Sequence, residues 1–495
     1  MHRIYLVSPY TDKTFNSPHN SLEYIKFYLM DHGYNAEIVD CAYYDPDLEE
    51  VVAKFKEDGK PIIGITAYTR ERFYAYDLIR KLRKEIPDSL IVVGGRHFSC
   101  LTVEALKNLP EIDIVVRGDG EETFKEICDS VYNRISYYDI KGISYNNGER
   151  IVNNPDRPNE KNLDRFRCFD KDYLPDPERY PLLPPPKNKI GTGEKLRFIT
   201  VMATRGCPSS CVFCSLKANK VRFRSIDNVI AEIEDKLEIT GSRGVNFKDP
   251  SLTLVKGYVK ELCEKILERN LNVKWMCYSR VDIDLDLLVL MRKAGLVGVE
   301  VALESGSPRV LKSIRKRINV DQFERFCKEA YRLGIRVYVF CLLSLPDERI
   351  EDVDMTLAVI KRVSRYIYYG GMQTTRILPD AELYSIAKER KVLPDDFDWF
   401  KPYTFESESS VSNPFYYSIP VYLEHLSQAE ITEKLYEFDE IVKTDFSSFY
   451  NFKRTLKANL KSERLRGLTL SDLKRKTGKA LVMLKYAYKN RRKHI

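Results

Sequence analysis

Phe198-Ile-Thr-Val-Met-Ala-Thr-Arg-Gly-Cys207-Pro-Ser-Ser-Cys211-Val-Phe-Cys214 is the stretch that decides the fold class of this chain. Its apolar first part predicts a strand, and a loop carrying three cysteines follows at once. The next cysteine is Cys263, 49 residues after Cys214 and inside a helical pattern. A structural zinc site needs four ligands, usually from two paired C-x-x-C units. The spacing therefore indicates a site with three protein ligands.

Three thiolates on one loop suit a cubane iron–sulfur cluster in which one iron keeps an open position. Such an iron can bind a ligand and pass an electron to it. Zinc and three incidental core cysteines are the alternatives, and the loop position with its Gly, Pro and Ser neighbours favours the cluster. We therefore predict that Cys207, Cys211 and Cys214 are the metal ligands and the catalytic centre. The chain has 11 cysteines and only these three are clustered, so a disulfide framework is not indicated.

The composition is that of an ordinary globular protein. The 495 residues allow two or three domains, and 43% hydrophobic with 31% charged residues exclude wholesale disorder. No apolar run reaches the roughly 18 residues that a membrane-spanning helix needs, and the first residues lack a signal-peptide cleavage pattern. The sequence therefore predicts a cytoplasmic protein. The six histidines include no H-x-x-x-H pair, which argues against a histidine-built metal site.

Outward from the cysteine loop, strands and helices alternate over residues 196–400. Six strand–helix units in about 200 residues are too few to close an eight-unit barrel, so we predict a partial (β/α)6 barrel. The helical patterns include residues 227–237, 256–269 and 320–333. The expected strands are residues 198–203, 244–247, 273–278, 297–302, 336–342 and 371–377.

Residues 1–132 show the same alternation and predict a separate α/β domain, a doubly wound, Rossmann-like parallel sheet covered on both faces. Residues 133–195 read as a connector with a hairpin at residues 146–148 and a proline-rich stretch at 174–186. Residues 401–495 become helical and increasingly basic. The strands expected in the first domain are residues 3–7, 36–40, 61–66, 90–93 and 113–116.

Small and polar residues follow several strands of the first domain. Doubly wound sheets bind ligands at the carboxyl ends of their strands, and glycine there lets the backbone approach a bulky ligand. Tight turns between strand and helix are the alternative for any one of them, but together on one rim they favour a ligand site. The predicted cofactor-binding residues of this rim are Ser8, Tyr10, Thr66, Tyr68, Gly94, Gly95, His97, Gly118, Gly120 and Glu121.

The cysteine run resembles the radical S-adenosylmethionine (SAM) superfamily, whose pattern is C-x3-C-x-aromatic-C. Phe213 takes the aromatic place, which in the family lies beside the SAM adenine. The resemblance implies a [4Fe–4S] cluster whose open iron binds the amino and carboxylate groups of SAM. One electron then cleaves the sulfonium and gives a 5′-deoxyadenosyl radical, which abstracts hydrogen. A flavodoxin- or ferredoxin-type reductant is implied as the partner.

Four later segments are similar to family elements in the expected order: residues 247–253, 279–282, 302–307 and 343–348. The last departs from the family pattern, because Ser344 and Asp347 stand where the family usually has glycine. A buried ion pair at Arg280 or Glu304 and a turn or helix cap at Asp249 are the structural alternatives. The SAM-binding residues that the resemblance implies are Asp249, Arg280, Glu304, Ser305 and Ser307.

The first domain resembles that of the cobalamin-binding subclass. Residues 93–98 and 117–123 are similar to its G-G-x-H and R-G-E-G-E-x-T segments. Cobalamin would then lie flat on the strand ends and face SAM, so that a substrate radical collects a methyl group or closes a ring. The sequence has no D-x-H-x-x-G run, so a histidine ligand for cobalt is not predicted. His97 is better explained as a hydrogen-bonding loop residue than as a cobalt ligand. A radical SAM enzyme whose first domain is only a scaffold is the alternative.

The carboxyl-terminal residues hold the excess positive charge. Residues 453–495 carry 15 Lys/Arg and two acidic side chains. Residues 468–495 predict a basic amphipathic helix, which could lie on an anionic membrane, grip nucleic-acid phosphates or dock on the barrel. The membrane interpretation predicts a lipid substrate and a protein peripheral at the membrane; otherwise we expect a small molecule. An RNA-modifying or nucleic-acid-binding iron–sulfur protein is the competing class.

Overall fold

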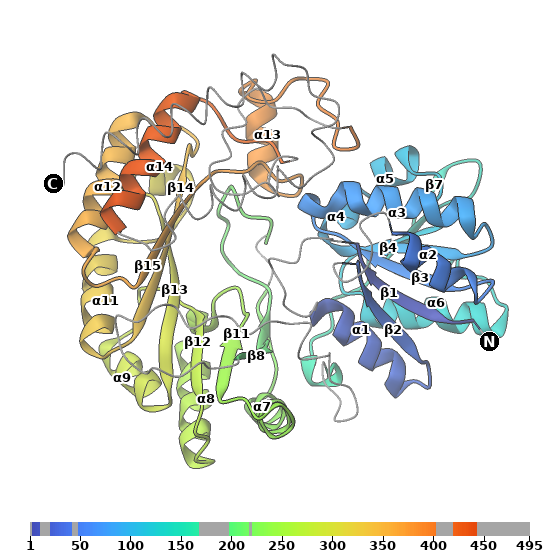
Figure 1. Cartoon of the computed structure of the whole chain (residues 1–495), viewed down its shortest axis with the longest axis horizontal. Coiled ribbons are helices and arrows are strands. Elements are labelled where there is room, and N and C mark those ends of the chain that lie inside the picture. The colour runs from blue at the N-terminus through green and yellow to red at the C-terminus, as the bar shows by residue number, and fades with distance from the viewer. Residues whose placement is uncertain are drawn as a thin grey trace.

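The computed structural model describes residues 2–9, 20–41, 48–167, 198–216, 220–401 and 419–442. Two α/β units follow one another along the chain and lie side by side (Figure 1). The predicted fold class is confirmed, because each unit holds a parallel sheet with helices between its strands. Tyr10, residues 168–197 and the basic helix predicted at 468–495 lie outside the described residues.

The sheet of the first unit runs in the order β2-β1-β3-β4-β5-β6-β7. The inner strands β1, β3 and β4 are largely buried because helices cover both faces, and their near-continuous apolar sequences suit that burial, whereas the edge strand β2 is mostly half-buried. The strands are β1 (Ile4–Ser8), β2 (Ala36–Asp40), β3 (Ile62–Thr66), β4 (Leu90–Gly94) and β5 (Ile114–Val116). The helices are α1 (Asn20–Asp31), α2 (Glu49–Lys56), α3 (Arg72–Glu85), α4 (Gly95–Cys100), α5 (Thr102–Asn108) and α6 (Glu121–Asn133).

The hairpin predicted in the connector belongs to this sheet instead. Strands β6 (Ile143–Asn146) and β7 (Ile151–Asn153) pair antiparallel and extend the edge next to β5. The turn between them contains Gly148, whose φ of 90° is a conformation that glycine tolerates. The first domain therefore continues beyond residue 132, because the hairpin satisfies the hydrogen-bonding groups that β5 would leave exposed.

The second unit is a curved six-stranded parallel sheet, the predicted partial barrel, in the order β15-β14-β13-β12-β11-β8. Its strands are β8 (Phe198–Val201), β11 (Gly244–Phe247), β12 (Lys274–Tyr278), β13 (Leu296–Glu304), β14 (Arg336–Leu343) and β15 (Tyr369–Thr374). Its helices are α7 (Ile226–Thr240), α8 (Lys256–Glu268), α9 (Leu285–Lys293), α10 (Pro308–Ser313), α11 (Val320–Arg332) and α12 (Ile350–Val363). The short antiparallel pair β9 (Thr204–Arg205) and β10 (Arg222–Phe223) was not expected.

Alternation along the barrel strands separates two faces. In β14, Val337, Val339 and Cys341 are buried in the core beneath the outer helices, whereas Tyr338 and Phe340 are only half-buried. Side chains of successive residues point to opposite sides of a strand, so the half-buried set lies on the inner, helix-free face. That inner face is therefore where the barrel offers side chains to a ligand.

The chain after β15 returns to the first domain, which the predicted boundary at residue 400 did not anticipate. Helix α13 (Glu382–Glu389) lies between the two units in Figure 1. Leu383, Trp399 and Tyr422 belong to the same apolar core as Tyr76 and Phe98 of the first domain. Helix α14 (Gln428–Val442) then packs against α12 and β15 of the barrel. The segment therefore fastens the two units together.

Buried charges lie where α1 of the first domain meets α7 of the barrel. Glu23 on α1 is 7% exposed, and burial raises the pKa of its carboxyl to about 7, although Lys236 opposes the shift. On α7, Lys236 bonds Glu232 at 2.6 Å, and Arg224 pairs with the same carboxylate. Glu23 therefore faces a mixed cluster on the other unit rather than solvent.

Candidate active site

The cysteine loop leaves β9 through Gly206, whose φ of 97° favours glycine. Cys207, Cys211 and Cys214 are unpaired and partly exposed. The amide of Leu216 donates to the Cys214 sulfur at 3.4 Å, a contact typical of a thiolate ligand. The other free cysteines of the described chain are buried, apart from the half-buried Cys100: Cys41, Cys128, Cys263, Cys277, Cys327 and Cys341. Three accessible thiols on one loop are the donor set that a [4Fe–4S] cluster with one open iron requires.

Both domains hold the loop in place. The amide of Val212 donates to the Ile314 carbonyl at 3.2 Å, after α10, and the amide of Leu383 on α13 donates to Val212 at 2.8 Å. Phe213 is half-buried between apolar clusters of the first domain and of the α10 region. The sequence alone could not place α13 here, because this contact joins residues about 170 positions apart.

Positive charges surround the thiols. Burial raises the pKa of Cys211, and the ammonium of Lys316 opposes that shift. Cys214 also has a raised pKa through burial, with Arg96 of the first domain acting in the opposite direction. Arg280 interacts electrostatically with Cys207 and Cys211 while forming a bidentate pair with Asp282 at 2.8 and 2.7 Å. These cations suit a site that gathers thiolates and an anionic ligand group.

Glu304 ends β13 beside the loop. Its φ of 65° is strained for a residue other than glycine, and its carboxylate pairs with Lys316 at 3.0 Å. This pair is 8% exposed at Glu304 and 23% at Lys316, so it is a largely desolvated ion pair next to Cys211. Glu304 and Arg280, two predicted SAM contacts, thus lie beside the cysteine loop, and each has a partner in the protein.

Asp249, a predicted SAM contact, is held by protein groups. It is fully buried at the end of β11 and accepts hydrogen bonds from the Thr204 hydroxyl at 2.6 Å and from the amides of Thr204 and Ala203. Burial raises the pKa of Asp249 to about 6, partly offset by these bonds. The carboxylate therefore anchors the turn that leads into the cysteine loop and offers no free edge to a ligand.

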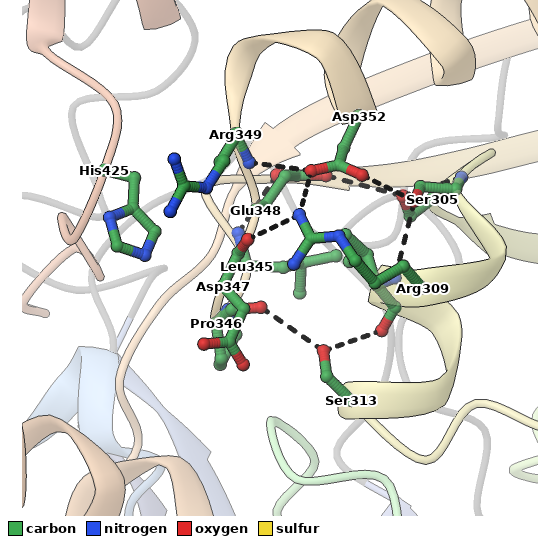
Figure 2. Close-up of polar contacts among 12 residues, drawn as sticks. Ser305, Arg309, Ser313, Leu345, Pro346, Asp347, Glu348, Arg349, Asp352 and His425 are labelled. Atoms are coloured by element: carbon green, nitrogen blue, oxygen red, sulfur yellow. Dashed lines mark hydrogen bonds and ion pairs between the residues drawn. The ribbon is translucent and has the colours of Figure 1, made fainter.

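Ser305 and Ser307, two further predicted SAM contacts, also bond protein groups. Both are buried, and their hydroxyls bond protein groups: Ser307 donates to Asp352 at 2.6 Å and caps α10, while Ser305 donates to Glu348 at 3.4 Å. Figure 2 shows Ser305 among these partners, with Arg309 reaching Asp352. Burial raises the pKa of Glu348 to about 7. These bonds hold the segment that directly follows Glu304 at the end of β13.

The loop after β14 has the left-handed backbone that favours glycine, although other residues occupy these positions. Ser344 and Asp347 both have φ of 64°. The Ser344 hydroxyl donates to the Tyr422 carbonyl at 2.6 Å, and Arg390 bridges Asp347 and Glu424 at 2.9 Å each. His425 completes an acidic cluster there, but the guanidinium already neutralises both carboxylates. Hydrogen bonds from the returning segment thus hold the strained loop.

In the first domain, the sheet order β2-β1-β3-β4-β5 places a topological switch point between β1 and β3. Ligands bind doubly wound sheets at this point, outside the carboxyl ends of the strands. Ser8 ends β1 and is buried, Thr66 ends β3 and is half-buried, and Tyr68 follows with 47% of its surface exposed. These strand ends therefore lie together at the switch point, the place where such sheets bind ligands.

His97 and the Gly94-Gly95 turn have structural roles that the prediction of cofactor contacts missed. A Cβ on Gly95 would lie 2.6 Å from the Thr66 hydroxyl, so glycine permits the turn after β4 to pack closely against the end of β3. His97 is fully buried against Tyr76, and burial lowers its pKa to about 3. Its ring nitrogens face Tyr76 and Thr69. Arg96 between them donates to the Ser215 carbonyl of the cysteine loop.

The R-G-D-G-E-E segment, residues 117–122, also contacts the barrel domain. Arg205 of β9 pairs with Glu121 at 2.6 Å, and Arg222 of β10 pairs with Asp119 at 2.5 Å. The Glu121 side chain is 5% exposed, and its ion pair joins the first domain to the barrel. Gly118, with φ of 78°, has open space beside it, whereas a Cβ on Gly120 would lie 3.1 Å from Ile25. Of these residues only Gly118 keeps room for a ligand.

Comparison with known proteins agrees with this geometry. Residues 201–360 match the radical SAM superfamily, and residues 14–128 match the B12 binding domain. The chain is 30% identical over 405 residues to an uncharacterized methyltransferase of Pyrococcus horikoshii, covering 79% of this chain and 84% of that protein. It is 29% identical over 352 residues to the anaerobic magnesium-protoporphyrin IX monomethyl ester cyclase of Rubrivivax gelatinosus, covering 69% of this chain and 61% of the cyclase.

Solved structures share the two-domain fold. The radical SAM methyltransferase TsrM of Kitasatospora setae, with cobalamin and a [4Fe–4S] cluster bound, superposes with a TM-score of 0.66 at 19% identity, covering 79% of this chain and 78% of that one. The cobalamin-dependent SAM radical enzyme OxsB superposes with a TM-score of 0.65 at 14% identity, covering 88% and 66%.

The chain therefore belongs to the radical SAM superfamily, in the group that carries a B12-binding domain. It is a cobalamin-dependent radical SAM enzyme of the methyltransferase and cyclase type, and its cofactors are a [4Fe–4S] cluster, SAM and cobalamin. Radical SAM enzymes need a reductant and a substrate. Among the described residues, no helix is long and apolar enough to cross a membrane.

Lys316, Arg205 and Arg96 are the functional candidates that sequence reasoning missed. Lys316 lies in a short basic run, and nothing in that run indicates a contact with the cysteine loop. Arg205 lies just before the first cysteine, and no sequence pattern indicates its partner. Arg96 lies between Gly95 and His97 in the segment that resembles the cobalamin-binding subclass. A charged side chain at that position could have indicated a contact with another domain. Their roles depend on the packing of two domains, which no local pattern reports.

Proposed function

We propose that this enzyme transfers a methyl group to an unactivated carbon of its substrate and so forms a carbon–carbon bond. The observation that carries the proposal is the direct contact between the turn after β4 and the cysteine loop, made by Arg96 and Ser215. That contact keeps the cobalamin-type rim beside the cluster ligands. Bound together, cobalamin would supply the methyl group, and the cluster with SAM would supply the hydrogen-abstracting radical.

The residues of the chain would orient these groups and shield them. Arg280 and Lys316 provide positive charge for an anionic group of SAM, while Glu304 fixes the Lys316 ammonium. Arg205 and Glu121 hold the two domains in register beside the loop. The partly exposed cysteine loop suits electron delivery from a flavodoxin- or ferredoxin-type reductant.

Ring formation is the second candidate reaction. Relatives named as magnesium-protoporphyrin IX monomethyl ester cyclases include one that is 29% identical over 352 residues. A ring-closing enzyme would use the same radical without adding a methyl carbon to the product. The proposed lipid substrate and membrane contact depend on residues 468–495, which the described structure does not include. They remain hypotheses, as does the cytoplasmic location.

The test uses holoenzyme isolated without oxygen, with reconstituted cluster and cobalamin. It is given a reductant, SAM carrying a trideuterated methyl group and a metabolite extract of the source cells. The expected result is about one corrinoid per chain, release of 5′-deoxyadenosine, and a product heavier by the labelled methyl group on carbon. A product that has lost hydrogen and gained no label would replace methyl transfer with ring formation. Labelled methyl on oxygen or nitrogen would overturn the proposal.

A further inference from the structure

The inner face of the barrel carries a row of polar and aromatic side chains with no role in the cofactor sites. Cross-strand pairing places Tyr278 beside Glu300, Glu300 beside Tyr338 and Tyr338 beside Tyr369. The residues that flank Glu300 in β13, Val299 and Val301, are buried in the core beneath the helices. Glu300 therefore points to the opposite, inner face, where it is half-buried.

Glu300 is a carboxylate without a cationic partner. Tyr278 is its cross-strand neighbour, and burial together with this carboxylate raises the pKa of Tyr278. In the described part of the chain, no Lys, Arg or His side chain forms an ion pair with Glu300. A half-buried carboxylate beside aromatic rings is costly unless a cation or several hydrogen-bond donors meet it. The row is thus incomplete without a ligand.

Aromatic rings surround the position. Tyr338 and Tyr368 lie with tilted rings whose centroids are 5.4 Å apart, and the ring centroids of Phe340 and Tyr369 lie 6.4 Å apart. The Lys248 ammonium lies 5.7 Å from the centroid of Tyr278, so this wall already accepts a cation on a ring face. A carboxylate set among tyrosine rings is the environment that binds ammonium groups through both charge and ring quadrupoles.

A second, independent observation lies one layer below. Asn246 of β11 is 4% exposed, and its amide oxygen has no hydrogen-bond partner among the described residues. Val245 and Phe247 on either side face the helix-side core, so Asn246 points to the same inner face as Glu300. It pairs in register with Met276, two residues before Tyr278. A buried acceptor without a donor is rare in native proteins and marks a place for a ligand group.

Small residues leave room beside the row. Gly298 lies two residues before Glu300, and a Cβ there would approach the Tyr338 ring to 3.2 Å. Gly371, paired with Phe340 and directly beyond Tyr369, has the nearest side-chain atoms at 3.4 Å. Larger side chains at these positions would press against the aromatic wall. The glycines therefore keep the rings in place around Glu300.

We propose that the inner row of the barrel, with Glu300 at its centre and Tyr278, Tyr338 and Tyr369 around it, binds a cationic nitrogen group of the substrate. The assignment deepens the proposed function, on which it rests, by naming the chemical class of the substrate as an amine or ammonium compound. The carboxylate balances the charge, the rings contact its alkyl groups, and Asn246 accepts a hydrogen bond from a more distant donor.

The test measures binding apart from methyl transfer. Holoenzyme with cluster, cobalamin and SAM is dialysed to equilibrium against labelled choline and, separately, against its uncharged isostere 3,3-dimethyl-1-butanol. Wild type should retain choline and not the alcohol. Glu300→Gln should bind choline about tenfold more weakly, the loss expected for a charged contact of this kind, and Tyr278→Phe should show a smaller loss. Glu261→Gln, on the exposed side of α8, should bind as wild type does.

Several outcomes would overturn the assignment. These are failure of wild type to retain choline, equal retention of choline and the alcohol, and unchanged choline binding by Glu300→Gln. Iron and corrinoid contents of each variant verify that it has folded, and Tyr278→Phe keeps the test decisive if Glu300→Gln does not fold. A holoenzyme that transfers methyl groups and ignores choline would sink this inference alone. One that binds choline and transfers no methyl group would sink the proposed function alone.

Discussion

The carboxyl-end edges of the two parallel sheets look alike in the sequence and differ in the structure. At the barrel edge, Cys207, Cys211 and Cys214 remain unpaired and partly exposed. At the edge of the first sheet, His97 is buried, and Glu121 pairs with an arginine of the other domain. Both edges carry motif residues after apolar strands. The three thiols of the barrel edge stay accessible, whereas His97 and Glu121 of the first edge already have protein partners.

The difference teaches that a motif at the end of a strand has two possible uses. A side chain there can meet a cofactor, or it can fix the neighbouring domain so that the cofactor is correctly placed. Asp249, Ser305 and Ser307 show that the barrel edge contains both kinds, because all three are buried and bonded to protein groups. The burial of a side chain and its hydrogen-bond partners in the protein distinguish these two uses.

The largest expected effect is loss of the cluster. Replacing Cys207, Cys211 and Cys214 by alanine removes every protein ligand, so cluster absorbance and 5′-deoxyadenosine release should both disappear. Cys263→Ala is the matched control, because Cys263 is a buried residue of α8 away from the loop. It should keep iron and sulfide content at the wild-type level. A cluster that survives in the triple variant would mean that the loop is not its site.

The fold could be predicted from the sequence because its signals are local and repeated. Apolar runs such as β3 and β4 and the alternating helices recur along the chain, so errors in one element do not change the architecture. The cysteine ligands were predictable for the same reason, since Cys207 to Cys214 lie within eight consecutive residues. Spacing alone reports their chemistry.

The remaining parts of the site depend on contacts between distant residues. Lys316 meets Glu304 only because α10 folds back over the cysteine loop, and Arg205 meets Glu121 only because the domains dock. The sequence predicts Glu121 as a cofactor contact, but it could not report the arginine that pairs with this buried carboxylate in the structure. Sequence patterns specify residue types and not their partners.

The second effect tests the first-sheet edge. Glu121→Gln leaves Arg205 without its main partner in a buried interface, where the two side chains are 5% and 14% exposed. Removing one member of a buried pair should lower the free energy of unfolding by about 3 kcal/mol. Denaturant unfolding monitored with cobalamin retention would measure it. Asp395→Asn, in a pair that is 70% and 78% exposed, should change stability by less than about 0.5 kcal/mol.

If Glu121→Gln kept full stability and instead lost corrinoid, the residue would be a cofactor contact after all. The comparison between the two edges would then weaken. A double-mutant cycle with Arg205→Gln separates the cases, because a true pair shows coupling between the two changes. Additive effects would assign Glu121 to a role outside the ion pair.

The third effect concerns the charges between α1 and α7. The pKa of Glu23 is raised from 4.5 to about 7 by burial, so the folded protein binds a proton that the unfolded chain releases above its own pKa. Stability from this group is therefore complete below about pH 4.5 and is lost as the pH rises through about 7. Glu23→Gln should remove this slope and stabilise the protein at pH 8 by roughly 2–3 kcal/mol.

Thermal unfolding of wild type and Glu23→Gln across this pH range would measure the difference between their slopes. Other buried acids contribute to both curves equally, so the difference isolates Glu23. Asp77→Asn, on the exposed face of α3, is the control, and its stability should vary with pH as that of wild type does, since the Asp77 side chain is 75% exposed. A parallel pair of curves for Glu23→Gln and wild type would contradict the buried-charge account of the interface.

The smallest effect is expected at Ser344, where the barrel edge departs from the family glycine. Ser344→Gly relieves a left-handed backbone by about 1 kcal/mol and loses a hydrogen bond to Tyr422 worth about the same, so stability should barely change. Ser344→Ala keeps the strain and loses the bond, so it should cost about 1 kcal/mol. Urea unfolding of the two variants would distinguish these outcomes. Equal losses in both would mean that the bond to the returning segment matters and the backbone strain does not.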